Sequence, residues 1–295
     1  MVPLRFRRLT TTTKQIFGDP IREVMLHVDQ PLPSSVPATA GSANSGIAVI
    51  TLNRPKSANA LGLTLIQQLK EISSFLRAND QQRCCIICSS SEKVFCAGAD
   101  LKERASLKET SEVVECVDRL RQTFEDIAQL PMPTLSVIEG AAFGGGLELA
   151  LATDMRIAST NATFGLVETS LSIIPGAGGT VRLPRLIGAA RAKELIFTAR
   201  KFNAEAAAEL GIIHHLVEPG NAMLKAFSIA EEIAKNGPLA VRAAKKAIDR
   251  GLEATTIGSA LKIEKECYAS ILPTSDRLEG LAAFNERRKP VFQGK

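Results

Sequence analysis

Two stretches of the chain place apolar residues every three or four positions, which is the spacing of one face of an α-helix. They cover residues 61–78 and 111–130. The apolar positions are Leu61, Leu65, Leu69, Ile72 and Leu76 in the first stretch, and Val114, Val117, Leu120, Phe124 and Ile127 in the second. Each stretch therefore predicts an amphipathic helix that packs one side against a core.

Short apolar runs alternate with these helices. They are GIAVITLN at 46–53, RCCIICSS at 83–90 and PTLSVIEG at 133–140, and each predicts a strand. After the third run a triple glycine opens a further helix. Strands that alternate with helices predict an α/β core, in which parallel strands are joined by right-handed crossovers.

From about residue 185 onward the pattern becomes helical, apart from one short strand near HHLVE. The expected helices cover 190–199, 203–210, 222–235, 238–250, 256–270 and 275–288. This region is too dissected to form a separate core. We expect it to cover the α/β part or to pack against another subunit.

The basic charge of the chain is concentrated at its N-terminus. Residues 1–18 contain three arginines, one lysine and no acid, so they contribute +4 of the net charge of +5 and leave +1 for the remainder. An arginine- and threonine-rich leader without acids is typical of a transit peptide, and arginine outweighs serine here, which favours the mitochondrial matrix. The alternative is a basic tail without a targeting role.

A segment rich in proline, serine, alanine and glycine, PLPSSVPATAGSANSG, follows the leader and predicts a linker or exposed loop. The expected organisation is a transit peptide and leader at 1–30, a flexible linker at 31–45, an α/β core at 46–200 and a helical region at 201–295. The composition is 45% hydrophobic and 23% charged, as in an ordinary globular protein. No apolar run reaches the roughly 18 residues that a membrane helix needs, so no membrane association is expected.

Three of the six cysteines, Cys84, Cys85 and Cys88, form a CCxxC cluster that could suggest a metal site. They lie in an expected buried strand, and no second ligand pair follows at the spacing of a zinc site. We therefore expect free thiols that pack as small hydrophobic side chains, and no metal.

Two glutamates stand in apolar sequence beside glycine-bearing loops. Glu148 lies in AAFGGGLELALA, three residues after Gly145, and Glu168 lies in FGLVETSLSIIPGAGGT. Burying a lone carboxylate in apolar surroundings is costly, and a solvated position would have been easy to provide. A pair of such carboxylates can move protons on a substrate at neutral pH.

Two loops could present backbone N–H groups to an anionic oxygen. In VFCAGADLKER a strand enters a tight turn at Gly98, and in FGGGLE a helix begins. N–H groups in such places have no intrahelical partner, and two that converge on one oxygen would form an oxyanion hole. Taken alone, the glycines could serve only close helix–sheet packing, and the helix dipole could favour Glu148. PGAGGT at 175–180 has no lysine in register for a phosphate loop, and we expect it to start a helix and shape the pocket wall.

Three motifs in order, FCAGADLKE, AAFGGGLELALATD and VETSLSIIPGAGGTVRLPRLIG, resemble the enoyl-CoA hydratase (crotonase) family, and most of all its mitochondrial members related to methylglutaconyl-CoA hydratase. The resemblance spans residues 46–295 and includes the C-terminal DRLEGLAAFNERRKP. It implies an α/β fold built as a spiral of ββα turns, with a C-terminal helical trimerisation region. It also implies a homotrimer or homohexamer that acts on an acyl-CoA substrate without a separate cofactor.

The resemblance also implies roles for individual residues. The backbone N–H groups of Ala99 and Gly145 would bind the thioester oxygen, and Glu148 and Glu168 would handle water and the proton at C2. Which glutamate is the base stays open. The residues expected to bind the coenzyme A nucleotide are Ala97, Asp100, Leu101 and Lys102.

The expected reaction is the addition of water across the 2,3 double bond of an enoyl-CoA, in fatty-acid or branched-chain amino-acid degradation. Family isomerases commonly lack one of the two glutamates, so their presence favours hydration over isomerisation, the same-fold alternative. RNA binding is an alternative from another class. The near-neutral charge beyond the leader argues against it, as do an aromatic content of 4% and a first core helix with only Lys70 and Arg77 as cations.

Overall fold

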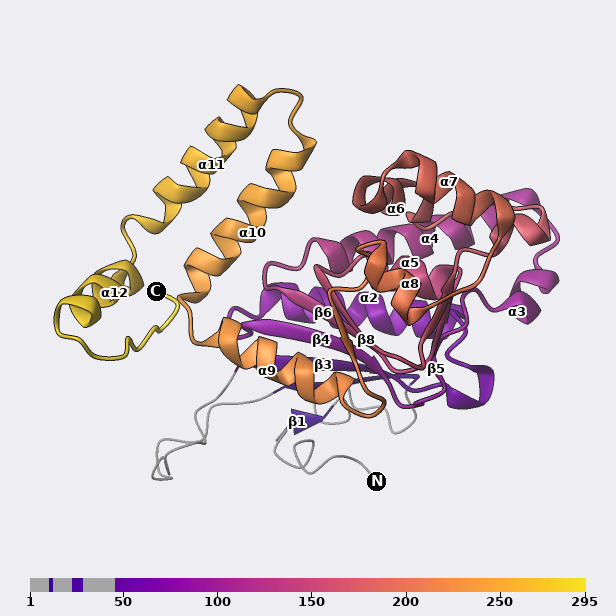
Figure 1. Cartoon of the computed structure of the whole chain (residues 1–295), viewed down its shortest axis with the longest axis horizontal. Coiled ribbons are helices and arrows are strands. Elements are labelled where there is room, and N and C mark those ends of the chain that lie inside the picture. The colour runs from indigo at the N-terminus through magenta and orange to yellow at the C-terminus, as the bar shows by residue number, and fades with distance from the viewer. Residues whose placement is uncertain (1–10, 13–22, 29–45) are drawn as a thin grey trace.

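The computed structural model describes residues 11–12, 23–28 and 46–295. Two sheets form the centre of this part of the chain, and helices surround them (Figure 1). The order of the larger sheet is β1 (Thr11–Thr12), β2 (Val24–Val28), β3 (Ile47–Leu52), β4 (Cys84–Ser89), β6 (Thr134–Ile138), β8 (Met155–Ser159) and β11 (His215–Val217). The order of the smaller sheet is β10 (Phe202–Asn203), β9 (Thr163–Gly165), β7 (Ala141–Phe143) and β5 (Val94–Cys96).

The chain winds between the two sheets in repeated turns. β4, β6 and β8 belong to the larger sheet, and the strand that follows each of them, β5, β7 or β9, belongs to the smaller one. Helical segments then lead to the next turn. Within each sheet these strands pair in parallel, as predicted, whereas β1, β2 and β10 pair antiparallel with their neighbours.

The helices have the following bounds: α2 Leu63–Ala78, α3 Leu101–Ser106, α4 Thr110–Ala128, α5 Gly145–Leu151, α6 Gly179–Ile187, α7 Ala189–Thr198, α8 Ala204–Glu209, α9 Ala222–Ala234, α10 Pro238–Glu253, α11 Ile257–Ile271 and α12 Ser275–Asn285. Two short 3-10 helices are η2 (Pro55–Ser57) and η3 (Glu168–Leu171). The helices expected from periodicity at 61–78 and 111–130 are confirmed as α2 and α4, and each of the six C-terminal stretches contains a helix. None of the described helices is long and apolar enough to cross a membrane.

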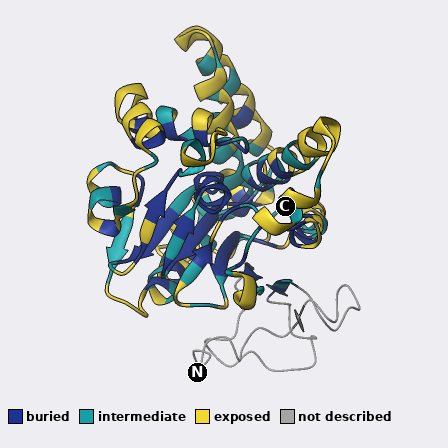
Figure 2. Cartoon of the chain, turned by 90° about the vertical axis from the view of Figure 1, so that its right-hand side faces the viewer, coloured by how far each residue is buried: buried dark blue, intermediate teal, exposed yellow. Residues whose placement is uncertain are grey.

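Alternate residues of the large sheet point into two apolar layers, which explains why its strands read as continuous apolar runs. Ala48, Ile50, Cys85 and Ile87 pack with α2 and α4 in the larger layer. Ile47, Val49, Cys84 and Ile86 pack against α9 on the other face. Figure 2 shows the strands mostly buried, with the exposed residues on the outer helices.

The expected transit peptide and linker lie mainly outside the described residues, but β2 falls inside the stretch assigned to the leader. It pairs antiparallel with β3, and Val24, Leu26 and Val28 are at most 1% exposed. The apolar core thus includes residues upstream of position 46. At the other end, α10, α11 and α12 extend away from the sheets (Figure 1).

Candidate active site

Helix α5 begins where β7 ends and packs directly on β5. Gly144 precedes it with φ 51°, a left-handed value that favours glycine. A methyl group on Gly146 would lie only 2.2 Å from the carbonyl oxygen of Cys96, so a side chain there would force the helix away from the strand. The triple glycine therefore does serve close packing, and the same packing brings the start of α5 against the loop after β5.

The two glycine-bearing loops meet at this point. Gly98 has φ 97°, and a methyl group on it would lie 2.8 Å from the Phe143 carbonyl oxygen and 3.4 Å from the Gly145 nitrogen. The Ala99 nitrogen is 3.8 Å from where a methyl group on Gly145 would stand. Within the described part of the chain, neither the Ala99 nor the Gly145 N–H donates a hydrogen bond to a protein group. Two unpaired donors thus lie side by side, as an oxyanion hole requires.

Glu148 projects from the first turn of α5 and is only 2% exposed. Its Oε1 accepts hydrogen bonds from the N–H groups of Ala177 (2.9 Å) and Gly179 (2.8 Å), where α6 begins. Burial raises the pKa of Glu148, while these two N–H groups oppose the rise by stabilising the charged form. The carboxylate is consequently fixed in one orientation through one of its oxygens.

Glu168 opens η3 in the loop after β9. Its Oε1 is 3.1 Å from where a methyl group on Gly144 would stand, next to the start of α5. Its Oε2 is buried and has no hydrogen-bond partner among the described residues. Burial raises the pKa of Glu168 to about 7, and the charge of Glu148 contributes to the rise. The two carboxylates are therefore close enough to interact, and they differ in how readily each holds a proton.

This arrangement can be compared with known proteins. The model of the enoyl-CoA hydratase/isomerase family matches residues 42–295. The chain belongs to this family. A putative enoyl-CoA hydratase/isomerase of Bacillus subtilis is 50% identical over 251 residues, covering 85% of this chain and 96% of the relative. Mouse enoyl-CoA hydratase domain-containing protein 2, mitochondrial, is 50% identical (85% and 86% covered), and human methylglutaconyl-CoA hydratase, mitochondrial, is 48% identical (85% and 75% covered).

Among solved structures, the enoyl-CoA hydratase of Bacillus anthracis has a TM-score of 0.82 and 48% identity, with 85% of this chain and 96% of that chain covered. The crotonase-type fold implied by the sequence motifs is thus confirmed. Because these relatives carry hydratase names, the chain is an enzyme of the hydro-lyase type.

The four residues expected to bind coenzyme A lie together at the start of α3. Ala97 and Lys102 are exposed on the surface, and so is Leu101, with 54% of its area accessible. Asp100 differs, because it is 8% exposed and caps α3 by accepting from the N–H groups of Lys102 and Glu103. Nucleotide binding by this segment stays a prediction.

Several groups at this family site were not predicted from the sequence. The N–H groups of Ala177 and Gly179 belong to PGAGGT, which was expected to shape the pocket wall and does start α6. Their role as donors to Glu148 joins residues 29 and 31 positions apart, which no local pattern reveals. Arg104 on α3 lowers the pKa of both glutamates, although burial raises them overall.

The cysteine cluster does not converge on one point. Cys84 and Cys88 face the α9 layer, whereas Cys85 faces the α2 layer. Burial raises the pKa of Cys85 to about 12 and that of Cys88 to about 11, so both are thiols at neutral pH. Within residues 23–28 and 46–295, no three His, Cys, Asp or Glu side chains come together as a potential metal site.

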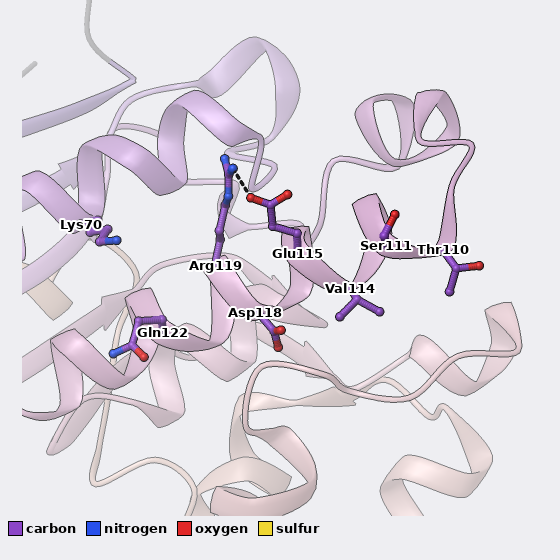
Figure 3. Close-up of a pocket in the computed structure, with 8 residues that line it drawn as sticks. All are labelled: Lys70, Thr110, Ser111, Val114, Glu115, Asp118, Arg119 and Gln122. Carbon is purple, nitrogen blue, oxygen red and sulfur yellow. Dashed lines mark hydrogen bonds and ion pairs between the residues drawn. The ribbon is translucent and has the colours of Figure 1, made fainter.

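A hollow with a volume of about 560 Å³ lies along α4, with Lys70 of α2 on its lining, and neither glutamate lines it (Figure 3). Its lining residues are Lys70, Thr110, Ser111, Val114, Glu115, Asp118, Arg119 and Gln122. Arg119 pairs with Glu115 there. Charges of both signs do not make the basic stripe that RNA binding would need.

Proposed function

We propose that the protein adds water across the 2,3 double bond of an enoyl-CoA thioester, giving a 3-hydroxyacyl-CoA. The observation that carries this proposal is the meeting of two unpaired N–H donors with two carboxylates of different environment at the start of α5. Hydration needs three things together: stabilisation of the thioester oxygen, a base for water and an acid for C2. The hydratase names of the relatives support it.

The proposed oxyanion hole consists of the Ala99 and Gly145 N–H groups. An enoyl thioester is a weak electrophile at C3 until its carbonyl oxygen can carry negative charge. Two donors that bind this oxygen more strongly as charge develops lower the barrier selectively. Both donors are already in position before the reaction, because close backbone packing holds the two loops.

We assign the two glutamates different roles. Glu148 accepts two N–H hydrogen bonds that favour its ionised form, so it is the base that takes a proton from water as the oxygen attacks C3. Glu168, with a pKa of about 7 and an unpartnered Oε2, is the acid that donates a proton to C2. The proton gained by Glu148 must return to Glu168 before the next turnover.

The test is a kinetic assay of the purified protein and two variants with crotonyl-CoA, alongside a panel of short, long and branched enoyl-CoAs that includes 3-methylglutaconyl-CoA. Glu148→Gln and Glu168→Gln should each lower kcat by about 10²- to 10⁴-fold, because each removes one proton-transfer group. The glutamine at 148 can still accept the two N–H bonds, so the fold should remain. Near-normal turnover in either variant contradicts the mechanism. Faster 3-enoyl-CoA isomerisation than hydration would instead favour the isomerase.

We further propose a mitochondrial matrix location and a role in fatty-acid or branched-chain amino-acid degradation. The arginine-rich leader and the mitochondrial names of several relatives support this location. A fusion of residues 1–45 to a fluorescent protein should enter mitochondria, and a fusion without residues 1–18 should not.

The proposed assembly is a homotrimer or homohexamer formed through the C-terminal helices. These helices carry many exposed large apolar side chains, which a partner subunit would cover. The most exposed are Ile248, Leu252, Ile257, Tyr268, Leu278 and Phe284. Sedimentation equilibrium would distinguish a monomer, a trimer and a hexamer.

A further inference from the structure

Arg54 lies at the centre of a charged cluster beside the proposed oxyanion hole. Its Nη1 donates to Asp100 Oδ2 at 2.6 Å and its Nε pairs with Glu23 at 3.0 Å. A third carboxylate, Glu103, is 3.7 Å from Nη2. The guanidinium is only 20% exposed, and the Asp100 side chain is 10% exposed, so both pairs are partly shielded from solvent.

Asp100 follows Ala99 directly, and both of its carboxylate oxygens are occupied. Oδ2 accepts from Arg54, while Oδ1 accepts from the N–H groups at the start of α3. Burial works against ionisation, but the hydrogen bond from Arg54 keeps the pKa of Asp100 below its ordinary value. The residue after the Ala99 donor is thus fixed from two sides.

The segment that begins at Arg54 also supports both donor loops. The Leu61 N–H donates to the Gly98 carbonyl at 2.8 Å, and the Leu61 side chain contacts Gly145. Arg54 Nη1 closes this segment on itself by donating to the Ala60 carbonyl at 3.0 Å. The Arg54 guanidinium therefore connects two parts of the site. One is the segment 54–61, which contacts both donor loops, and the other is Asp100, which follows the Ala99 donor.

Glu23 places the N-terminal strand in the same network. It precedes β2, and its carbonyl oxygen accepts from the Asn53 N–H at 2.7 Å. Its Oε2 is buried and unpartnered among the described residues, while Oε1 pairs with Arg54. The backbone N–H of Leu65 on α2 also stabilises the charged form of Glu23. Glu23 makes no hydrogen bond to either donor loop among the described residues, and Arg54 is the group that pairs with both Glu23 and Asp100.

We propose that Arg54 is a positioning residue of the oxyanion hole, which holds Ala99 in place through Asp100 and is itself held by Glu23. This inference rests on the hydratase function proposed above. In this proposal Arg54 acts through Asp100 and not on the substrate. It fixes the direction of one N–H donor, and a displacement of that donor by about 1 Å can cost about 100-fold in rate.

The first experiment compares Arg54→Met and Arg54→Lys with the unmodified enzyme. Arg54→Met should lower kcat about 10- to 100-fold with a small change in KM, because the loss falls on the transition state. Arg54→Lys should recover part of this loss, since an ammonium can pair with Asp100 but cannot bind Glu23 and Ala60 at the same time. Arg77→Met is the matched control: this exposed arginine pairs with Asp126 on the outer helices, and its loss should leave kcat unchanged.

The second experiment measures the oxyanion hole without turnover. Infrared spectroscopy of bound butyryl-CoA, labelled with ¹³C at the thioester carbonyl, reports the strength of the hydrogen bonds to that oxygen. The carbonyl frequency should rise in Arg54→Met relative to the unmodified enzyme. A purely structural role for Arg54 would lower the melting temperature but leave both this frequency and the kcat of folded enzyme unchanged, and that result would overturn the proposal.

Glu23→Gln completes the test and covers the case in which Arg54→Met does not fold. It should lower kcat several-fold in the unmodified background and have no effect in combination with Arg54→Lys or Arg54→Met. Independent, additive effects would contradict action through Arg54. Absence of hydration in the unmodified enzyme would instead reject the proposed function, while the infrared comparison would still decide whether Arg54 positions the donor.

Discussion

Replacing Glu168 by glutamine should stabilise the folded protein above neutral pH, even though it removes the proposed proton donor. Burial raises the pKa of this carboxyl to about 7, against an ordinary value of 4.5. Well below pH 4.5 the Glu168 carboxyl is protonated in both the folded and unfolded states, so it does not change the free energy of unfolding. As the pH rises to 7, the unfolded chain ionises more readily than the folded one. The free energy of unfolding therefore falls over this window and stays lowered above it.

The magnitude follows from the two pKa values. Their difference corresponds to at most about 3 kcal/mol. Because the side chain is only partly buried, solvent screening reduces the expected effect to about 1–2 kcal/mol. Glutamine has nearly the same shape and cannot ionise, so the variant should be free of this penalty. Sites that hold an ionisable group in such a position trade stability for activity.

Urea unfolding of both proteins at pH 5, 6, 7 and 8 checks this reasoning. The stability difference between Glu168→Gln and the unmodified protein should grow from pH 5 to pH 7 and then level off. Glu92→Gln, which changes an exposed glutamate in a loop, is the control and should show no such growth. A difference that does not vary with pH would show that Glu168 ionises in the folded protein as it does in the unfolded chain, and would remove the basis for its role as acid.

Two further predictions concern the loops and the charge around the site. Gly98→Ala should lower kcat at least about 10-fold and destabilise the fold by about 1–3 kcal/mol, because φ is 97° and the new methyl group would lie 2.8 Å from the Phe143 carbonyl oxygen. Steady-state kinetics and thermal unfolding measure the two effects, and a variant with full activity would place the donors elsewhere. Arg104→Met should move both limbs of the pH profile of kcat/KM to higher pH, because Arg104 lowers the pKa of both glutamates. An unshifted profile would mean that Arg104 is too far from the carboxylates to matter.

The sequence predicts the helices and buried strands because their signal is local. α2 and α4 repeat apolar residues over four turns or more, and β4 and β6 are short apolar runs between turn signals. β2 was not predicted in this way. Its pairing with β3 spans a segment rich in proline, serine and glycine, and nothing local distinguishes five residues of an edge region from a leader. Position in the sheet, not composition, makes it part of the core.

The residues of the candidate site also divide into those that the sequence predicts and those that it does not. Gly98, Gly145, Glu148 and Glu168 stand out because glycines and apolar-flanked glutamates are unusual where they occur. The groups that set their properties do not. Arg54 meets partners 31 positions before it and 46 after it, and it follows a strand as an ordinary polar residue of a turn. Such contacts exist only once β2, β3 and α3 have come together.

The glycines near the carboxylates have a consequence for how the two glutamates are distinguished. A methyl group on Gly179 would lie 3.0 Å from Glu148 Oε1, and one on Gly144 would lie 3.1 Å from Glu168 Oε1. Both carboxylates are therefore approached closely by backbone, but Glu148 receives the N–H groups of two residues at the start of α6, whereas the backbone N–H that acts on Glu168 is its own. Beside α5, Glu168 meets the Cα of Gly144 and no donor, so burial and the charge of Glu148 raise its pKa and its proton is retained to higher pH. The direction in which each loop presents its backbone, together with the effect of the Glu148 charge on Glu168, thus separates the proposed base from the proposed acid.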